Sequence, residues 1–190
     1  REEAMDDPQQ LGRDHYPGNT WQDIARADGD LPPVLREQSN PPQNLRDIPF
    51  DRYTSQPWFD AEIERMWKRT WLYACRAEQL AEDGDFFVFD LARLSVVIVR
   101  TADRLRAYFN SCLHRGTKLK PSGTAGWSPT LKCPYHAWEW SLDGQIRNIP
   151  CDWEFTHVDR AANCLPQVRV DSWNGFVFIS FRADGPSLLE

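Results

Sequence analysis

The sequence predicts a mainly β protein of small antiparallel sheets, preceded by one helix and an extended arm. Three observations lead to this prediction. Beyond the first 71 residues, short apolar runs alternate with period two, and Asp143-Gly144 and Asn174-Gly175 supply turn signals between them. A stripe of apolar residues with helical spacing precedes these runs. The first fifty residues are acidic and rich in proline, with ten acidic residues and five arginines.

Residues 1–50 are predicted to form an extended, proline-rich acidic arm. Seven of the 14 prolines of the chain lie in it, and such a stretch cannot build a core of its own. One short helix is expected inside the arm, with Asn19 or Thr20 as its cap and Trp21 and Ile24 on one face. The sequence leaves two states of the arm open, a disordered leader and a segment packed on a neighbouring subunit.

Residues 51–190 are predicted to form a single domain that opens with a helix over 58–69. Phe59, Ile63 and Trp67 fall on one face of this helix. Acidic residues lie near its start and basic residues near its end, which suits the helix dipole. We therefore expect a helix that faces the core.

The strands are predicted from alternation and from their content of β-branched and aromatic residues. They are Phe86–Asp90, Leu94–Arg100, Leu105–Phe109, Trp138–Ser141, Gln145–Asn148, Gln167–Val170 and Gly175–Phe181. Asp143-Gly144, between two of these strands, predicts a hairpin with a type I′ turn. Asn174-Gly175 predicts a second turn or a bulge.

Composition excludes several classes of function. The net charge of -6, from 22 basic and 28 acidic residues, argues against nucleic acid as the main partner. No apolar run is long enough to span a membrane, and no secretion leader is recognisable, so we expect neither membrane association nor export. Five scattered cysteines make a poor disulfide framework and predict a reducing, cytoplasmic location.

Four residues with metal-binding side chains stand in two short segments. Cys112 and His114 are separated by one residue, Cys133 and His136 by two. Each segment offers one thiolate and one imidazole, which predicts a [2Fe-2S] cluster whose inner iron binds both cysteines and whose outer iron binds both histidines. A tetrahedral zinc site is the alternative, although zinc modules usually pair cysteine with cysteine and histidine with histidine.

The segments that carry these residues resemble the N-terminal Rieske domain of ring-hydroxylating oxygenase α subunits. The matching runs are Asn110-Ser111-Cys112-Leu113-His114-Arg115-Gly116, Cys133-Pro134-Tyr135-His136-Ala137-Trp138 and Leu142-Asp143-Gly144. The likeness covers roughly residues 50 to 185 and implies the Rieske iron-sulfur fold, with two cluster-binding loops. Ala137 departs from it, because the family usually has glycine at that place.

Neighbours of the four ligands distinguish the chain from Rieske proteins of respiratory complexes. The family pattern of those proteins has an extra cysteine in each loop and a serine two residues after the second histidine. Here the three places hold Thr117, Tyr135 and Trp138, which implies a low-potential cluster of the oxygenase type. We expect Arg115, Tyr135 and Trp138 to surround the ligands, with Trp138 covering the cluster and Arg115 either steering a redox partner or forming a surface ion pair.

The resemblance implies a relay of electrons in a Rieske oxygenase of aromatic hydrocarbon catabolism. A ferredoxin or flavin reductase would donate electrons, and a mononuclear iron in the catalytic domain of the same or a neighbouring subunit would accept them. The full-length protein is expected to be a homo-oligomer, a trimer. The alternative is a stand-alone Rieske ferredoxin, although residues 1–70 exceed what a minimal carrier needs.

The mononuclear iron itself is not expected in this chain. Such a site needs two histidines and a carboxylate. Once the cluster has taken two of the four histidines, only His15 and His157 remain, with Asp159 near the second. We therefore expect the Fe(II) site in a catalytic domain that this chain lacks.

Overall fold

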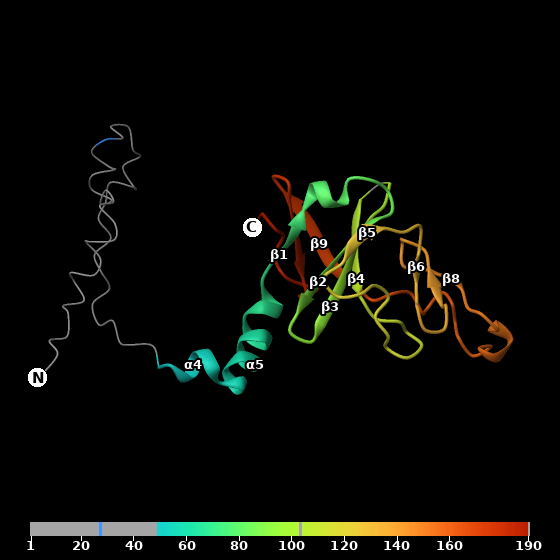
Figure 1. The fold of residues 1–190 in the computed structure, drawn as a ribbon, viewed down its shortest axis with the longest axis horizontal. Coiled ribbons are helices and arrows are strands. Elements are labelled where there is room, and N and C mark those ends of the chain that lie inside the picture. Colours follow the sequence, from blue (N-terminus) through green and yellow to red (C-terminus); the bar gives the residue numbers. More distant parts are fainter. Residues whose placement is uncertain (1–26, 28–48, 103, 190) are drawn as a thin grey trace, which may run out of the picture. The chain divides into compact units, whose positions relative to one another are not determined.

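Antiparallel strands dominate the part of the chain that the computed structural model describes, namely residues 27, 49–102 and 104–189 (Figure 1). The prediction of a mainly β fold is confirmed. The predicted arm over 1–50 and its short helix lie almost entirely outside the described residues.

Two short helices and a helical turn precede the sheets. They are α4 (Asp51–Thr54), α5 (Gln56–Arg65) and the 3-10 turn η1 (Trp67–Arg69). Ser55 caps α5, because its hydroxyl accepts a hydrogen bond from the amide of Trp58 at 3.4 Å, so the helix begins two residues before the predicted start. The α-helix ends at Arg65, and only Ile63 of its residues is buried. It therefore contributes less to the core than its apolar stripe suggests.

The larger sheet has seven strands in the order β1-β10-β9-β4-β3-β2-β5. Their bounds are β1 (Leu72–Arg76), β2 (Asp85–Leu91), β3 (Leu94–Arg100), β4 (Leu105–Phe109), β5 (Ala125–Trp127), β9 (Gln167–Trp173) and β10 (Phe176–Ser180), with the 3-10 turn η2 (Ala77–Leu80) after β1. Along β3, Val96 and Ile98 face one core cluster, whereas Val97 and Val99 face the other. Apolar side chains thus cover both faces of the sheet at its centre. The cluster with Val97 and Val99 also contains the predicted ligands Cys112 and Cys133.

The smaller sheet carries the second metal-binding segment. Its strands are β6 (Leu131–Lys132), β7 (Glu139–Trp140) and β8 (Ile146–Asn148), and the 3-10 turn η3 (Asp152–Glu154) follows it. In the view of Figure 1, this sheet lies on the side of the described body where β4 and β5 are labelled. The first metal-binding segment leaves β4 and the second connects β6 to β7, so the two sheets bring the segments together. No helix in the described ranges combines the length and the apolar character needed to cross a membrane.

One of the two glycine turns agrees with its prediction and the other differs in type. Asn174 and Gly175 have φ angles of 48° and 82° between paired strands β9 and β10, which defines a type I′ turn. Gly144 has a φ of 86° and its amide donates to the carbonyl of Ser141 at 2.9 Å, but Asp143 does not share the positive φ. The β7–β8 hairpin is therefore present with a type I turn followed by a left-handed glycine, and the predicted type I′ turn at this place is wrong.

Candidate metal centre

The two metal-binding loops have the same backbone design. In each, the cysteine amide donates to the carbonyl five residues later, at 2.8 Å for both Cys112 to Thr117 and Cys133 to Trp138. The cysteine carbonyl in turn accepts from the amide four residues later, at 2.8 Å from Gly116 and 3.2 Å from Ala137. Each cysteine thus begins a closed turn that holds its side chain inward, and both cysteines are buried.

The residue four places after each cysteine is left-handed. Gly116 has a φ of 74° and Ala137 a φ of 56°. Glycine adopts this conformation freely, whereas it costs an L-residue about 1–2 kcal/mol. The second loop therefore has the same shape as the first although it carries alanine at the glycine position, and it bears the conformational cost.

Replacing Ala137 with glycine is expected to stabilise the protein by about 0.5–1 kcal/mol, since the relief of the left-handed cost exceeds the entropy that glycine adds to the unfolded chain. The reciprocal change Gly116→Ala is the matched control. A Cβ there would meet nothing closer than Ser111 Oγ at 3.9 Å, so only the backbone cost applies and a loss of about 1 kcal/mol is expected. Urea unfolding of the three proteins measures both changes, and a destabilised Ala137→Gly protein would contradict the argument.

Asn110 fastens the first loop at both ends, a role that no sequence pattern indicates. Its side chain is buried and donates to Ser95 Oγ at 3.1 Å and to the carbonyl of Lys120 at 2.8 Å. The oxygen of its side-chain amide accepts from the backbone amides of Leu119 and Lys120 at 3.0 and 2.9 Å. One side chain thereby ties the start of the loop to its end and to β3.

A second tie joins the loop to β2 through Asp90. Its carboxylate accepts from Lys118 Nζ at 3.1 Å and from the amide of Gly123 at 3.2 Å. Burial acts to raise the pKa of Asp90, but hydrogen bonds from Ser95, Lys118 and Gly123 outweigh it and lower the pKa below its usual range. The charged carboxylate is therefore the form that holds the loop.

Because the pKa of Asp90 is lower in the folded protein than in the unfolded chain, its stabilisation is present above pH 4 and is lost as the pH falls through the folded value. Asp90→Asn is expected to cost about 1 kcal/mol at pH 7. The difference in unfolding free energy between wild type and variant should shrink toward pH 3. Urea titrations between pH 3 and 7 measure it, and a difference that does not vary with pH would refute the charged role of Asp90.

The fold brings the four predicted ligands together in like pairs. Cys112 and Cys133 are buried in the same core cluster, and burial, followed by the neighbouring Cys133 thiol, raises the pKa of Cys112. The rings of His114 and His136 lie 4.7 Å apart and are half-buried. Burial, the neighbouring imidazole and Arg115 lower the pKa of His114, which favours the neutral form that binds metals.

This donor set fits a two-iron cluster. Nδ1 of His114 is buried and has no hydrogen-bond partner, as expected of a nitrogen that has a metal to bind. Within the described ranges, no three His, Cys, Asp or Glu side chains converge on one metal position, as a tetrahedral zinc site would require. In a [2Fe-2S] cluster each iron takes only two protein ligands, and two thiols beside two imidazoles match that need.

The residues predicted to surround the ligands fall into two groups. Trp138 is buried and stacks on His114, with the ring centroids 5.1 Å apart and the planes at 4°. Tyr135 lies 3.7 Å from the ring of His136 and is 61% exposed. Arg115 is exposed and acts on His114 through its charge. Aromatic side chains therefore contact both imidazoles, one inside the protein and one at its surface.

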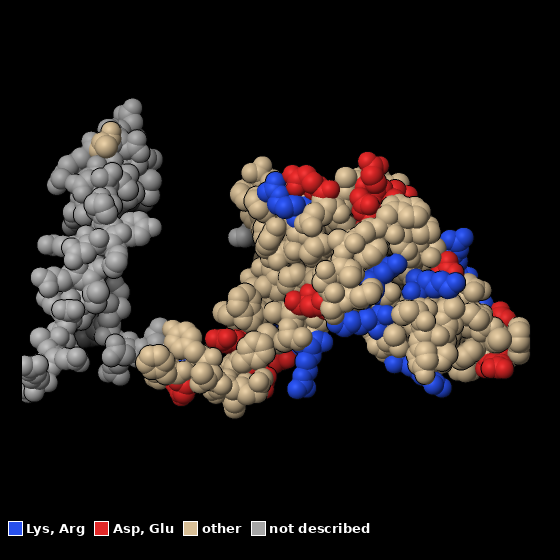
Figure 2. Space-filling model, viewed as in Figure 1, with Lys and Arg blue, Asp and Glu red and all other residues tan. Residues whose placement is uncertain are grey.

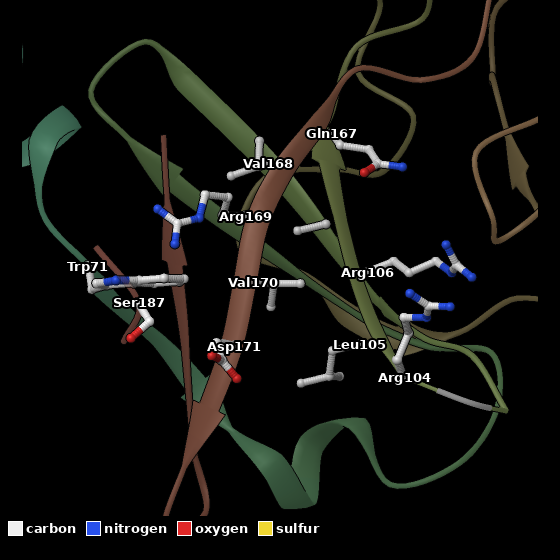
Figure 3. Close-up of a pocket in the computed structure, with 11 residues that line it drawn as sticks. Trp71, Arg104, Leu105, Arg106, Gln167, Val168, Arg169, Val170, Asp171 and Ser187 are labelled. Atoms are coloured by element: carbon white, nitrogen blue, oxygen red, sulfur yellow. The ribbon is translucent and has the colours of Figure 1, made fainter. Parts of the chain in front are cut away.

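A polar pocket elsewhere contains none of the predicted ligands. It has a volume of about 320 Å³, lies between β4 and β9 and is lined in part by Trp71, Arg169 and Ser187 (Figure 3). Arg169 donates to the carbonyls of Gly185 and Pro186 at 2.9 and 2.8 Å, and its guanidinium lies over Trp71. The guanidinium thus fastens the C-terminal segment to the sheet.

A family model for the Rieske [2Fe-2S] domain matches residues 70–167, and the chain belongs to this family. Its relatives are subunits of Rieske oxygenases. The oxygenase subunit of carnitine monooxygenase from Escherichia coli (strain K12) is 33% identical over 77% of this chain and 39% of its own length. The large subunit of anthranilate 1,2-dioxygenase from Acinetobacter baylyi is 30% identical over 75% of this chain and 31% of its own.

A solved structure agrees with these relatives. The quaternary ammonium Rieske monooxygenase whose structure gives insight into carnitine oxidation and inter-subunit electron transfer has a TM-score of 0.67, with 29% identity over 74% of this chain and 38% of its own. The chain therefore spans about two fifths or less of the length of these relatives. Because they include a carnitine and an anthranilate oxygenase, the class that they share is wider than the predicted aromatic-ring oxygenases.

Proposed function

We propose that this chain is the electron-transfer domain of an oxygenase α subunit and holds one Rieske [2Fe-2S] cluster. Cys112 and Cys133 hold the inner iron, and His114 and His136 hold the outer iron. The observation that carries this assignment is the separation of the donors, with two neighbouring thiols buried in one core cluster and two half-buried imidazoles 4.7 Å apart. When bound, the cluster takes up and releases one electron.

The side chains of the site have different roles in such an electron relay. The two thiolates neutralise positive charge inside the core, where no solvent can do so. The neutral imidazoles leave the outer iron less negatively ligated and favour reduction. Trp138 keeps water from one face of His114, whereas His136 and exposed Tyr135 form the surface through which we propose that electrons leave.

We propose that a ferredoxin or flavin reductase supplies the electrons, and that a mononuclear iron in the catalytic domain of the same or a neighbouring subunit receives them. The inter-subunit electron transfer named for the similar monooxygenase supports an acceptor in a neighbouring subunit of a homo-oligomer, which we propose is a trimer. Lys and Arg side chains gather on the half of the face in Figure 2 that carries the smaller sheet and its neighbouring loops. A donor with acidic side chains would suit this surface.

We further propose an aromatic hydrocarbon as the substrate of the whole enzyme, which a biphenyl dioxygenase α subunit that is 29% identical over 72% of this chain supports. A cytoplasmic location suits the five cysteines, all of which are free in the structure. Of those outside the proposed site, Cys75 is buried and Cys151 is exposed. An exposed free thiol persists in a reducing compartment.

Analysis of anaerobically purified protein tests the cluster. We expect about two irons and two acid-labile sulfides per chain and a Rieske-type electron paramagnetic resonance (EPR) spectrum after reduction. The midpoint potential should lie toward the lower end of the Rieske range of roughly -150 to +300 mV, because Trp138 occupies the place of a sulfide-bonding serine. A colourless protein that binds one zinc would overturn the proposal.

A further inference from the structure

Three aromatic rings surround the imidazole of His114. Trp138 stacks on one face at 5.1 Å, and the ring of His136 contacts it edge-on at 4.7 Å. The third is Phe155, whose ring centroid lies 5.6 Å from that of His114 with the planes at 86°. Phe155 also contacts Trp138, at 5.2 Å and 90°, so it fills the angle between the two stacked rings.

Phe155 belongs to a segment for which the sequence predicts no role. Its amide donates to the carbonyl of Asp152, and its carbonyl accepts from the amide of Val158, both at 2.9 Å. Arg160 closes the segment through an ion pair with Asp152 at 3.0 Å. Phe155 and Val158 are the two half-buried apolar side chains of this segment, and both pack against the core cluster that contains the cysteines.

The surroundings of the two imidazoles therefore differ. His114 lies between a buried tryptophan and Phe155, and its Nδ1 is buried. Among the described residues, His136 has Tyr135 as its aromatic neighbour besides His114, and Tyr135 is 61% exposed. Edge-to-face and stacked contacts restrict how far a ring can turn, and apolar rings exclude water from the side that they cover. Both effects act on His114.

We propose that Phe155 is a positioning residue for the outer iron: it holds the imidazole of His114 against Trp138 and keeps water from that side of the ligand. The inference rests on the proposed function, since it concerns a histidine that binds the cluster. It predicts that the electronic properties of the cluster depend on a ring that does not touch iron. Removal of the ring lets the imidazole turn and admits water. Water favours the reduced cluster, which carries one more negative charge.

The test compares Phe155→Leu and Phe155→Ala with Val158→Ala in the cluster-loaded chain. Val158 lies three residues away and packs on the same core cluster, so it is the matched control for a loss of packing. The measurements are the EPR g values and the nitrogen hyperfine couplings of the reduced protein, the deuterium coupling after transfer to heavy water, the midpoint potential at one pH and the melting temperature.

We expect both Phe155 variants to shift the g values and nitrogen couplings, to raise the potential and to gain deuterium coupling, with the larger change in Phe155→Ala. Val158→Ala should lower the melting temperature and leave the spectrum and potential unchanged. Phe155 variants that merely melt earlier, with the wild-type spectrum and potential, would overturn the positioning role alone. A wild-type protein without a Rieske spectrum would overturn the proposed function and this inference together.

Discussion

Alanine in place of His114 or of His136 is expected to remove the cluster from the purified protein. Each substitution takes away half of the protein ligands of the proposed outer iron, and no further His, Cys, Asp or Glu of the described ranges converges on the site to replace the lost ligand. Iron content should fall at least about tenfold, since even changes beside a metal ligand often cost 10–100-fold in affinity. Metal analysis and the EPR spectrum measure the loss.

The control for the histidine variants is His157→Ala. His157 is exposed, and its ring centroid lies 6.4 Å from that of Phe155. This variant should keep its iron and its spectrum. Circular dichroism shows whether the alanine proteins fold, and we expect that they do, because backbone hydrogen bonds close both loops without the imidazoles. A normal spectrum in His114→Ala or His136→Ala would mean that the ligand is wrongly assigned.

The cysteines offer a parallel experiment. Cys112→Ser and Cys133→Ser should also lose the cluster, since the inner iron binds the thiolates. Cys151→Ser is the matched control, because Cys151 is exposed and lies outside both loops. Loss of iron from Cys151→Ser with retention in Cys133→Ser would contradict the proposed division of the five cysteines.

Much of the sheet follows from local sequence, because alternation over five to seven residues carries its own signal. The predicted bounds of Leu94–Arg100 and Leu105–Phe109 are those observed. Alternation does not predict β1, β5 or β6. β1 has a register shift between Tyr73 and Cys75 that interrupts the alternation, and β6 has two residues. Such strands exist because a neighbouring strand pairs with them, which no local pattern reveals.

The candidate site shows the same division between local and distant causes. The spacing of Cys112 with His114, and of Cys133 with His136, predicts one thiol and one imidazole per loop. What the spacing does not predict is the support around them. The hydrogen bonds of Asn110 reach β3 and the far end of its loop, and Phe155 arrives at His114 from a segment about forty residues away. These contacts depend on tertiary packing.

Gly144 is required both by the local turn and by a contact with a residue distant in the sequence. The sequence identifies it as a turn residue, and its φ of 86° agrees. The structure adds that Tyr108 of β4 lies directly beneath it, fully buried, with its hydroxyl donating to the carbonyl of Leu142 at 3.1 Å. Burial raises the pKa of Tyr108 to about 12, so the phenol stays protonated and keeps this bond even near pH 10, where an ordinary tyrosine is half ionised. The ring is therefore held in place under the turn.

Gly144→Ala is accordingly expected to destabilise the protein by about 3 kcal/mol. A Cβ at this position would lie 2.7 Å from Cε1 of Tyr108, which costs about 1–3 kcal/mol as an overpacked contact, and the left-handed backbone adds about 1–2 kcal/mol. Gly123→Ala is the matched control: its φ is 66° and a Cβ there would meet nothing within 4 Å, so only the backbone cost of about 1–2 kcal/mol applies. Urea unfolding separates the two contributions.

The Gly144 substitution should also reach the metal centre. The turn connects β7 to β8, and β7 directly follows Trp138, the residue that stacks on His114. A hairpin displaced by Tyr108 would move that stack, so Gly144→Ala should bind less iron at equal protein concentration, whereas Gly123→Ala should not. Equal losses of stability in the two variants would show that Tyr108 yields to the new methyl group. In that case the turn, and not the ring beneath it, determines the need for glycine.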